Sequence, residues 1–136
     1  MDNTAQARII FAQDRYATEA TGIEIAMAGD HTSRCTMAVG ECHRNARGVV
    51  MGGALFTLAD FAAAVAANTD CLEDGTLHWV SLDATIHYLA PALDDSLVAE
   101  CKALKAGRTT ALYQTTIESP DNGKRIAIVE TTMIFV

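Results

Sequence analysis

Two kinds of hydrophobic pattern alternate along the chain, and its first third contains one of each. Residues 4–18 carry apolar side chains at loosely helical spacing and Gly22 closes the segment, so we expect a short amphipathic helix. Residues 23–27 and 35–39 alternate between apolar and polar, with a Gly29-Asp30 turn between them. That pattern predicts a β-hairpin.

The rest of the chain predicts one long helix and four further strands. Residues 40–48 are polar, follow neither period and indicate a loop. Residues 52–68 are rich in strong helix formers and apolar on every side, which is typical of a helix buried all round. The four alternating runs that follow are His78–Leu89, Ser96–Ala106, Thr109–Glu118 and Lys124–Val136.

This order of elements predicts an α+β fold. Helices and strands do not alternate strictly, so we expect an antiparallel sheet with its last four strands in a meander. The simplest packing wraps a sheet of about six strands around the long helix. A chain of 136 residues fits a single domain over residues 1–136, which can bury roughly two-thirds of its unfolded surface.

Composition and charge narrow the range of partners. The chain is 50% hydrophobic, which argues against disorder, and its net charge of −7 opposes binding to nucleic acid. Four cysteines without a Cys-x-x-Cys pair indicate reduced thiols, and no stretch approaches the roughly 20 uncharged residues of a membrane span. The first residues do not resemble a signal peptide, so we expect a cytoplasmic protein without nucleic-acid or membrane partners.

One acidic residue, Asp60, interrupts the long apolar helix. No Lys or Arg occurs between Arg47 and Lys102, so Asp60 has no basic partner at helical spacing. A buried, unpaired carboxylate has a raised pKa, and such positions are enriched in catalytic groups. Asp60 is therefore the first candidate for a catalytic residue. The alternative is a helix with one exposed strip, on which Asp60 simply faces water.

Two glycines, Gly52 and Gly53, stand where this helix begins. The first N–H groups of a helix lack partners within it and carry the positive end of its dipole. Glycine lets a substrate carbonyl approach that backbone closely, so the pair is a candidate oxyanion site. The alternative is a flexible helix start packed against a strand. The segment has neither the Lys-Ser/Thr of a phosphate loop nor a G-x-G-x-x-G spacing.

The segment Asn45–Asp60, NARGVVMGGALFTLAD, resembles the signature of hotdog-fold acyl-CoA thioesterases of the phenylacetic-acid-degradation type. The run from Val80 to Pro91 and the segment ALKAGR at 103–108 look like the same family's central strand and the turn after it. Together these segments cover most of residues 40–115. The resemblance implies a hotdog fold, in which an antiparallel sheet wraps a long central helix, and the hydrolysis of an acyl-CoA thioester.

The resemblance also implies roles for particular residues. By position, Asp60 is the general base or nucleophile, the Gly52 N–H donates to the thioester oxygen, and Asn45 orients the water or the carbonyl. Ser81 assists the water. The family commonly has His just before the glycine pair, whereas this chain has Met51, whose thioether cannot donate a hydrogen bond.

Further residues are candidates for contacts with the substrate. Lys105 and Arg108 flank the Ala106-Gly107 turn and, partly by the resemblance, are candidates for binding the phosphates of coenzyme A. The alternative is an ordinary solvated turn. A positioned water, one carboxylate and fixed donors suffice for a thioester, so we expect no metal and no cofactor beyond the CoA of the substrate itself. The remaining substrate-binding candidates lie at the start of the long helix: Met51, Gly53, Phe56 and Thr57.

The spacing of Gly52 and Asp60 predicts an oligomer. Eight residues at about 1.5 Å each separate them by about 12 Å along the helix, so they cannot both touch one carbonyl within one chain. The active unit is then at least a homodimer with two composite sites, and we expect a homotetramer built as a dimer of dimers.

Strand alternation predicts which way Ser81 points. It places Ser81 and Asp83 on one face of their strand and Val80 and Leu82 on the other, against the helix. Ser81 then reaches a thioester only if the site lies at a subunit junction or the strand bulges. An ordinary surface serine is the alternative.

We therefore expect an acyl-CoA thioesterase with Asp60 as its catalytic carboxylate. One alternative is a catalytically silent acyl-CoA-binding module, which Met51 favours. Another is a hydratase or dehydratase on the same fold, which requires a His beside the carboxylate. An aryl or medium-chain acyl group is compatible with the aromatic residues, which do not select between them: Phe56, Phe61, Trp79 and Tyr88.

Overall fold

The computed structural model describes all 136 residues. Its helical elements are α1 (Asn3–Phe11), a π-helical turn (Tyr16–Ala20), a 3-10 turn (Glu41–His43), α2 (Gly52–Ala67) and a second 3-10 turn (Leu72–Asp74). Its strands are β1 (Ile23–Gly29), β2 (Thr32–Ala38), β3 (Trp79–Tyr88), β4 (Ser96–Ala106), β5 (Thr110–Glu118) and β6 (Arg125–Phe135). The predicted hairpin, long helix and four later strands are all present.

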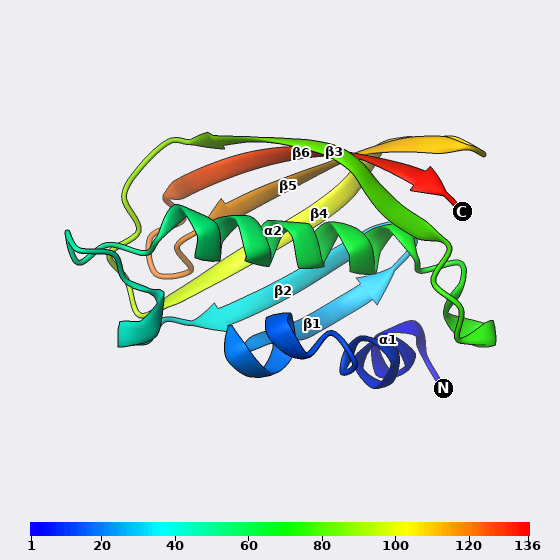
Figure 1. Cartoon of the computed structure of the whole chain (residues 1–136), viewed down its shortest axis with the longest axis horizontal. Coiled ribbons are helices and arrows are strands. Elements are labelled where there is room, and N and C mark those ends of the chain that lie inside the picture. Colours follow the sequence, from blue (N-terminus) through cyan, green and yellow to red (C-terminus); the bar gives the residue numbers. More distant parts are fainter.

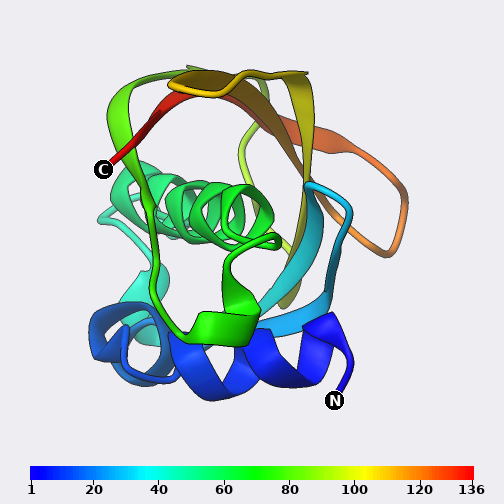
Figure 2. The same ribbon diagram turned by 90° about the vertical axis from the view of Figure 1, so that its right-hand side faces the viewer.

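The six strands form one antiparallel sheet in the order β1-β2-β4-β5-β6-β3. The sheet crosses behind α2 along the whole length of that helix (Figure 1). Seen from the end of α2, the sheet curls around the helix and α1 closes the space below it (Figure 2). The predicted six-stranded antiparallel sheet around a long helix is confirmed.

The predicted meander is wrong for β3. Strands β4, β5 and β6 do follow one another, but β3 pairs with β6 at the edge of the sheet. The β1–β2 hairpin takes the place beside β4 instead. The chain crosses between these two places through residues 89–95, where Ala92 O accepts from Val50 N–H and Asp95 O accepts from Val39 N–H.

The core lies between α2 and the concave face of the sheet. Alanines on α2 such as Ala59, Ala62 and Ala66 are fully buried, and their small size lets the helix lie close to the strands. The larger buried side chains of the helix are Leu55, Leu58, Phe61 and Val65. No helix of the chain is long and apolar enough to cross a membrane.

The four cysteines are free thiols, as expected. Cys35 on β2 and Cys101 on β4 lie in the core, and burial raises the pKa of each to about 12. Cys71 is also buried, whereas Cys42 is exposed in the 3-10 turn before α2.

The turn of the β1–β2 hairpin is Asp30-His31 rather than the predicted Gly29-Asp30. Asp30 and His31 have φ angles of 50° and 59°, the left-handed pair that a two-residue hairpin turn requires. The His31 side chain lies 3.0 Å from the Tyr113 hydroxyl and 2.9 Å from the Asp70 carboxylate. These contacts fasten the turn to the loop after α2 and to the core.

The predicted helix over residues 4–18 is wrong in its second half. Helix α1 ends at Phe11, and a π-helical turn follows from Tyr16. Asp14 N–H donates to Phe11 O, which tightens the last turn of the helix. The Thr18 hydroxyl donates to Asp14 O, and this local bond competes with a continuous helix.

Helix α2 is not buried on every side, as its pattern suggested. Within one chain, Gly53 and Asp60 are exposed, Phe56 and Thr57 between them are half-buried, and so is Ala64 one turn after Asp60. These residues follow helical spacing and form a strip that the sheet does not cover. The alternative of a helix with one exposed strip is therefore correct for the single chain.

A β-bulge in β3 overturns the predicted orientation of Ser81. The pairing with β6 shifts between Ser81 and Asp83, which leaves Leu82 as the extra residue. Ser81 therefore turns towards α2. Val80 and Leu82, expected against the helix, are instead 44% and 57% exposed.

Candidate active site

The start of α2 presents free backbone donors. Met51 occupies the N-cap position and makes no side-chain cap bond. Met51 O accepts from the N–H groups of Ala54 and Leu55, whereas no group of the chain accepts from Gly52 or Gly53 N–H. The two glycine amides thus stand unpaired at the positive end of the helix.

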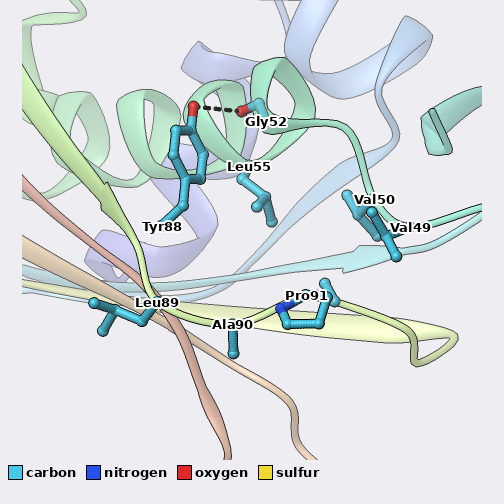
Figure 3. Close-up of a pocket in the computed structure, with 9 residues that line it drawn as sticks. Val49, Val50, Gly52, Leu55, Tyr88, Leu89, Ala90 and Pro91 are labelled. Carbon is cyan, nitrogen blue, oxygen red and sulfur yellow. Dashed lines mark hydrogen bonds between the residues drawn. The ribbon is translucent and has the colours of Figure 1, made fainter. Parts of the chain in front are cut away.

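A pocket of about 520 Å³ opens beside Gly52. The strand end and connection at 88–92 form one wall, and residues 49 and 50 form the other (Figure 3). Tyr88 projects from β3 towards the helix, and its hydroxyl donates to Gly52 O at 3.2 Å. Seven of the nine lining residues are hydrophobic: Val49, Val50, Leu55, Leu89, Ala90, Pro91 and Ala92 line the pocket with Gly52 and Tyr88.

Asn45 fixes the loop that leads into this pocket. Its side-chain oxygen accepts from Arg47 N–H at 2.9 Å and from Val49 N–H at 3.3 Å. Its backbone N–H donates to Val49 O. The side-chain oxygen is therefore occupied within the loop, and the amide NH₂ is the part of Asn45 left to contact a substrate.

Asp60 lies on the exposed strip of α2 and faces β3. Ser81 Oγ donates to Asp60 Oδ1 at 3.2 Å across the gap between the two elements. Asp60 is exposed along the strip, but its carboxyl is partly shielded from water. This partial burial raises the pKa of Asp60 above its ordinary value, and the hydrogen bond from Ser81 lowers it in part. Asp60 makes no ion pair, so the expectation that it lacks a basic partner agrees with the structure.

A second carboxylate, Asp14, lies in this region and is not evident from the sequence. Asp14 and Asp60 line the same pocket, of about 310 Å³, together with Thr57 and Tyr16. Burial raises the pKa of the Asp14 carboxyl, and the charge of Asp60 raises it further. Only the break between α1 and the π-helical turn brings Asp14 there, and the helical pattern over residues 4–18 gives no sign of that break.

The structure does not bring all the predicted site residues together in one chain. Gly52 and Asp60 line two separate pockets, eight residues apart on one continuous helix. Thr57 lies with Asp60, and its hydroxyl donates to Gly53 O within the helix. Phe56 is half-buried on the strip between the two pockets.

Lys105 and Arg108 lie at the β4–β5 turn, far from Gly52 of the same chain. The turn projects at the end of the molecule opposite to the start of α2 (Figure 1). Both side chains are exposed and neither forms an ion pair. A Cβ on Gly107 would clash with Thr110 O, so this tight turn requires glycine.

Three of the four histidines are engaged away from Asp60. His31 pairs with Asp70, and His78 lies beside Asp74. The His43 ring bridges Gly40 N–H and Thr21 O. No group of three or more His, Cys, Asp or Glu side chains is placed to hold a metal ion.

A six-stranded antiparallel sheet around one long helix is the hotdog fold. The PaaI protein from the phenylacetic acid degradation operon of Escherichia coli superposes with a TM-score of 0.86 at 25% identity, over 98% of this chain and 94% of that one. A hypothetical thioesterase of Streptococcus pneumoniae solved with coenzyme A superposes with a TM-score of 0.80 at 25% identity, over 93% and 96% of the two chains.

The family model described as the thioesterase superfamily matches residues 47–126, and the chain belongs to this superfamily. Human acyl-coenzyme A thioesterase 13 is 37% identical over 94 residues, which are 68% of this chain and 65% of that protein. The matches span less than two thirds of the length of the first curated relatives.

Proposed function

We propose that the protein hydrolyses acyl-CoA thioesters to the free acid and coenzyme A. The observation that carries the proposal is the placement of two complementary groups on α2: unpaired N–H donors at Gly52 and a carboxylate at Asp60 held by Ser81. Membership of the thioesterase superfamily and the similarity to an acyl-CoA thioesterase support the same activity.

The chemistry requires a base and an oxyanion site. Asp60 takes a proton from a water that attacks the thioester carbon, or attacks that carbon itself to form an anhydride that water then opens. The negative charge that develops on the carbonyl oxygen is met by the Gly52 N–H and the positive end of the helix. The thiol of coenzyme A leaves, and Asn45 orients the water or the carbonyl.

A complete site requires two subunits. About 12 Å of helix separates Gly52 from Asp60, so the donor of one subunit works with the carboxylate of another. Two features support a dimer that joins the chains beside α2. Strand β3 is an edge of the sheet with exposed Val80 and Leu82, and the uncovered strip of α2 carries Asp60. A dimer of such dimers is the proposed assembly.

The negatively charged coenzyme A is held by the exposed Lys105 and Arg108. These two cations have no ion-pair partner in the chain, which leaves them available for phosphates despite the net charge of −7. The apolar pocket beside Gly52 and the aromatic Phe56 suit an aryl or medium-chain acyl group.

Thiol release from short, medium, long and aryl acyl-CoAs, by wild type and by Asp60→Asn, tests the proposal. We expect turnover of at least one class by wild type and a loss of about a hundredfold or more in the variant, because the amide cannot act as base or nucleophile. Near-normal turnover by Asp60→Asn would contradict the assignment of Asp60 as the base or nucleophile. Binding of acyl-CoA without turnover by wild type would establish the silent binding module instead.

A further inference from the structure

Tyr88 carries the only side-chain hydrogen-bonding group in the pocket beside Gly52. The other eight lining residues offer hydrocarbon side chains or none. Gly52, whose N–H is unpaired, also lines the pocket, so a substrate oxygen there has two candidate donors, the Gly52 N–H and the Tyr88 hydroxyl. Tyr88 is 55% exposed and lines the pocket.

The hydroxyl lies directly against the predicted oxyanion donor. A Cβ built on Gly52 would lie 2.9 Å from the Tyr88 oxygen. Gly52 is also the residue whose N–H is the predicted oxyanion donor, so this donor and the phenol belong to neighbouring parts of one pocket lining. In the free chain the hydroxyl donates to Gly52 O at 3.2 Å, a long bond to a carbonyl that also serves as an acceptor within the helix.

We propose that the Tyr88 hydroxyl is a second donor to the thioester carbonyl oxygen, beside the Gly52 N–H. This inference rests on the proposed hydrolysis and adds a catalytic residue to it. When substrate binds, the phenol O–H turns from Gly52 O to the substrate oxygen and strengthens that bond as negative charge develops. The phenol keeps its proton throughout, and no covalent bond to Tyr88 forms or breaks.

The other side chain at the helix start does not fill this role. Met51, at the N-cap, has a thioether that only accepts hydrogen bonds, weakly. A tetrahedral oxyanion is commonly stabilised by more than one donor, and a single missing donor lowers kcat by a large factor. Tyr88 supplies a donor from β3 where the helix start has only its backbone to offer.

The competing explanation is that Tyr88 only packs against Gly52. The ring contacts the Gly52 position with Cζ and Cε1 at 3.0 and 3.2 Å from the Cβ site, so the ring alone fills the space above this residue. Tyr88→Phe keeps the ring and removes the hydroxyl, so it separates packing from hydrogen bonding.

The experiment compares wild type and Tyr88→Phe on the acyl-CoA that wild type turns over fastest. We expect kcat to fall about 10- to 100-fold with KM changed about twofold or less, because the lost bond strengthens in the transition state. A kcat within twofold of wild type would overturn the inference while leaving the proposed hydrolysis intact. A wild type that hydrolyses none of the esters overturns both.

Fluorinated tyrosines in place of Tyr88 provide a readout that a structural role would not move. Fluorine makes the phenol a stronger donor with little change in shape. At a pH where each phenol remains protonated, we expect kcat to rise as the phenol becomes more acidic. A kcat that does not depend on phenol acidity contradicts donation to the oxyanion, even if Tyr88→Phe is slow.

Discussion

At the residue scale, the protonation of Asp60 depends on a hydrogen bond from a different element. The carboxylate lies on α2, but the group that holds it is Ser81 of β3. Burial raises the pKa of Asp60, whereas the Ser81 bond stabilises the ionised form and lowers it. The balance of these two effects determines the pH at which the proposed base is available.

Replacing Ser81 by Ala shifts this balance. Without the hydrogen bond, the ionised carboxylate loses stabilisation and the pKa of Asp60 rises further above its ordinary value. The base must be ionised to act, so the acid limb of kcat/KM moves to higher pH. The pH-rate profile measures this, with Ser81→Thr as a control that keeps a hydroxyl. An acid limb at the same pH in Ser81→Ala would show that the bond does not tune Asp60.

Ionised Asp60 should also lower the stability of the folded protein. Its pKa is raised in the folded state, so the native chain holds the proton to higher pH than the unfolded chain does. Stability therefore falls as pH rises from the unfolded pKa through the folded one. We expect Asp60→Asn to have a higher Tm than wild type at pH 7 to 8 but not at about pH 3. Equal melting temperatures at both pH values would contradict this account.

The candidate site could be predicted from the sequence only in part. Asp60 and Gly52 stand out because each violates the pattern of its own helix. The contact of Ser81 with Asp60 depends on a bulge, and alternation without that bulge puts Ser81 on the wrong face. Asp14 lies 46 positions before Asp60, and only tertiary packing places the two carboxylates in one pocket.

At the element scale, one aromatic contact between α1 and α2 helps to position the segment with Asp14. Phe11, the last residue of α1, contacts Phe61 of α2 with ring centroids 5.6 Å apart and an interplanar angle of 82°. Such an edge-to-face pair is favourable beyond its buried area. Asp14 follows Phe11 by three residues, so this contact also holds the second carboxylate near Asp60.

Phe11→Ala should destabilise the protein by about 3–5 kcal/mol, because it leaves a cavity at a fully buried aromatic contact. Ile9→Ala is the matched control on the same helix. Ile9 is 61% exposed, so we expect its replacement to change stability by about 0.5 kcal/mol or less. Urea unfolding measures both. Equal losses in the two variants would show that α1 does not dock through Phe11.

The elements themselves were more predictable than their arrangement. Each strand after α2 shows a clear period of two, and the helix has a length and composition that no strand shares. The position of β3 at the far edge of the sheet is not encoded in its own residues. It follows from the β1–β2 hairpin, which occupies the place beside β4.

At the scale of the whole molecule, the proposed composite site assigns the parts of two half-sites to each chain. The Gly52 pocket and the Asp60 pocket lie on the same helix and do not meet. To complete either pocket, a second copy would have to bind at the edge strand β3 and the uncovered strip of α2. Mixed dimers can therefore test whether the sites are shared.

Two inactive variants should complement each other. Asp60→Asn removes the carboxylate. Gly52→Pro removes the N–H at the first position of the helix, where proline is tolerated, and Met51 already has the extended backbone that precedes proline. In a hybrid dimer, the Asp60→Asn subunit supplies Gly52 and the Gly52→Pro subunit supplies Asp60, so the proposed composite site forms once. The second site has neither group. Random mixing by co-expression should restore about a quarter of wild-type activity, since half of the dimers are hybrids.

The control for this experiment is Gly52→Ala. It adds the same Cβ beside Tyr88 but keeps the N–H, so it should retain more activity than Gly52→Pro. Complementation is measured on hybrids purified with two different affinity tags. Purified hybrids as inactive as their parents would show that Gly52 and Asp60 do not act across subunits.

The buried cysteines matter for the redox chemistry of the protein, because the proposed reaction releases a thiol. Disulfide exchange requires a thiolate, and burial raises the pKa of both Cys35 and Cys101 to about 12, so neither ionises at neutral pH. Both sulfurs are also out of reach inside the core. Oxidised coenzyme A would therefore leave these two residues unmodified, and the exposed Cys42 is the sulfur open to a mixed disulfide.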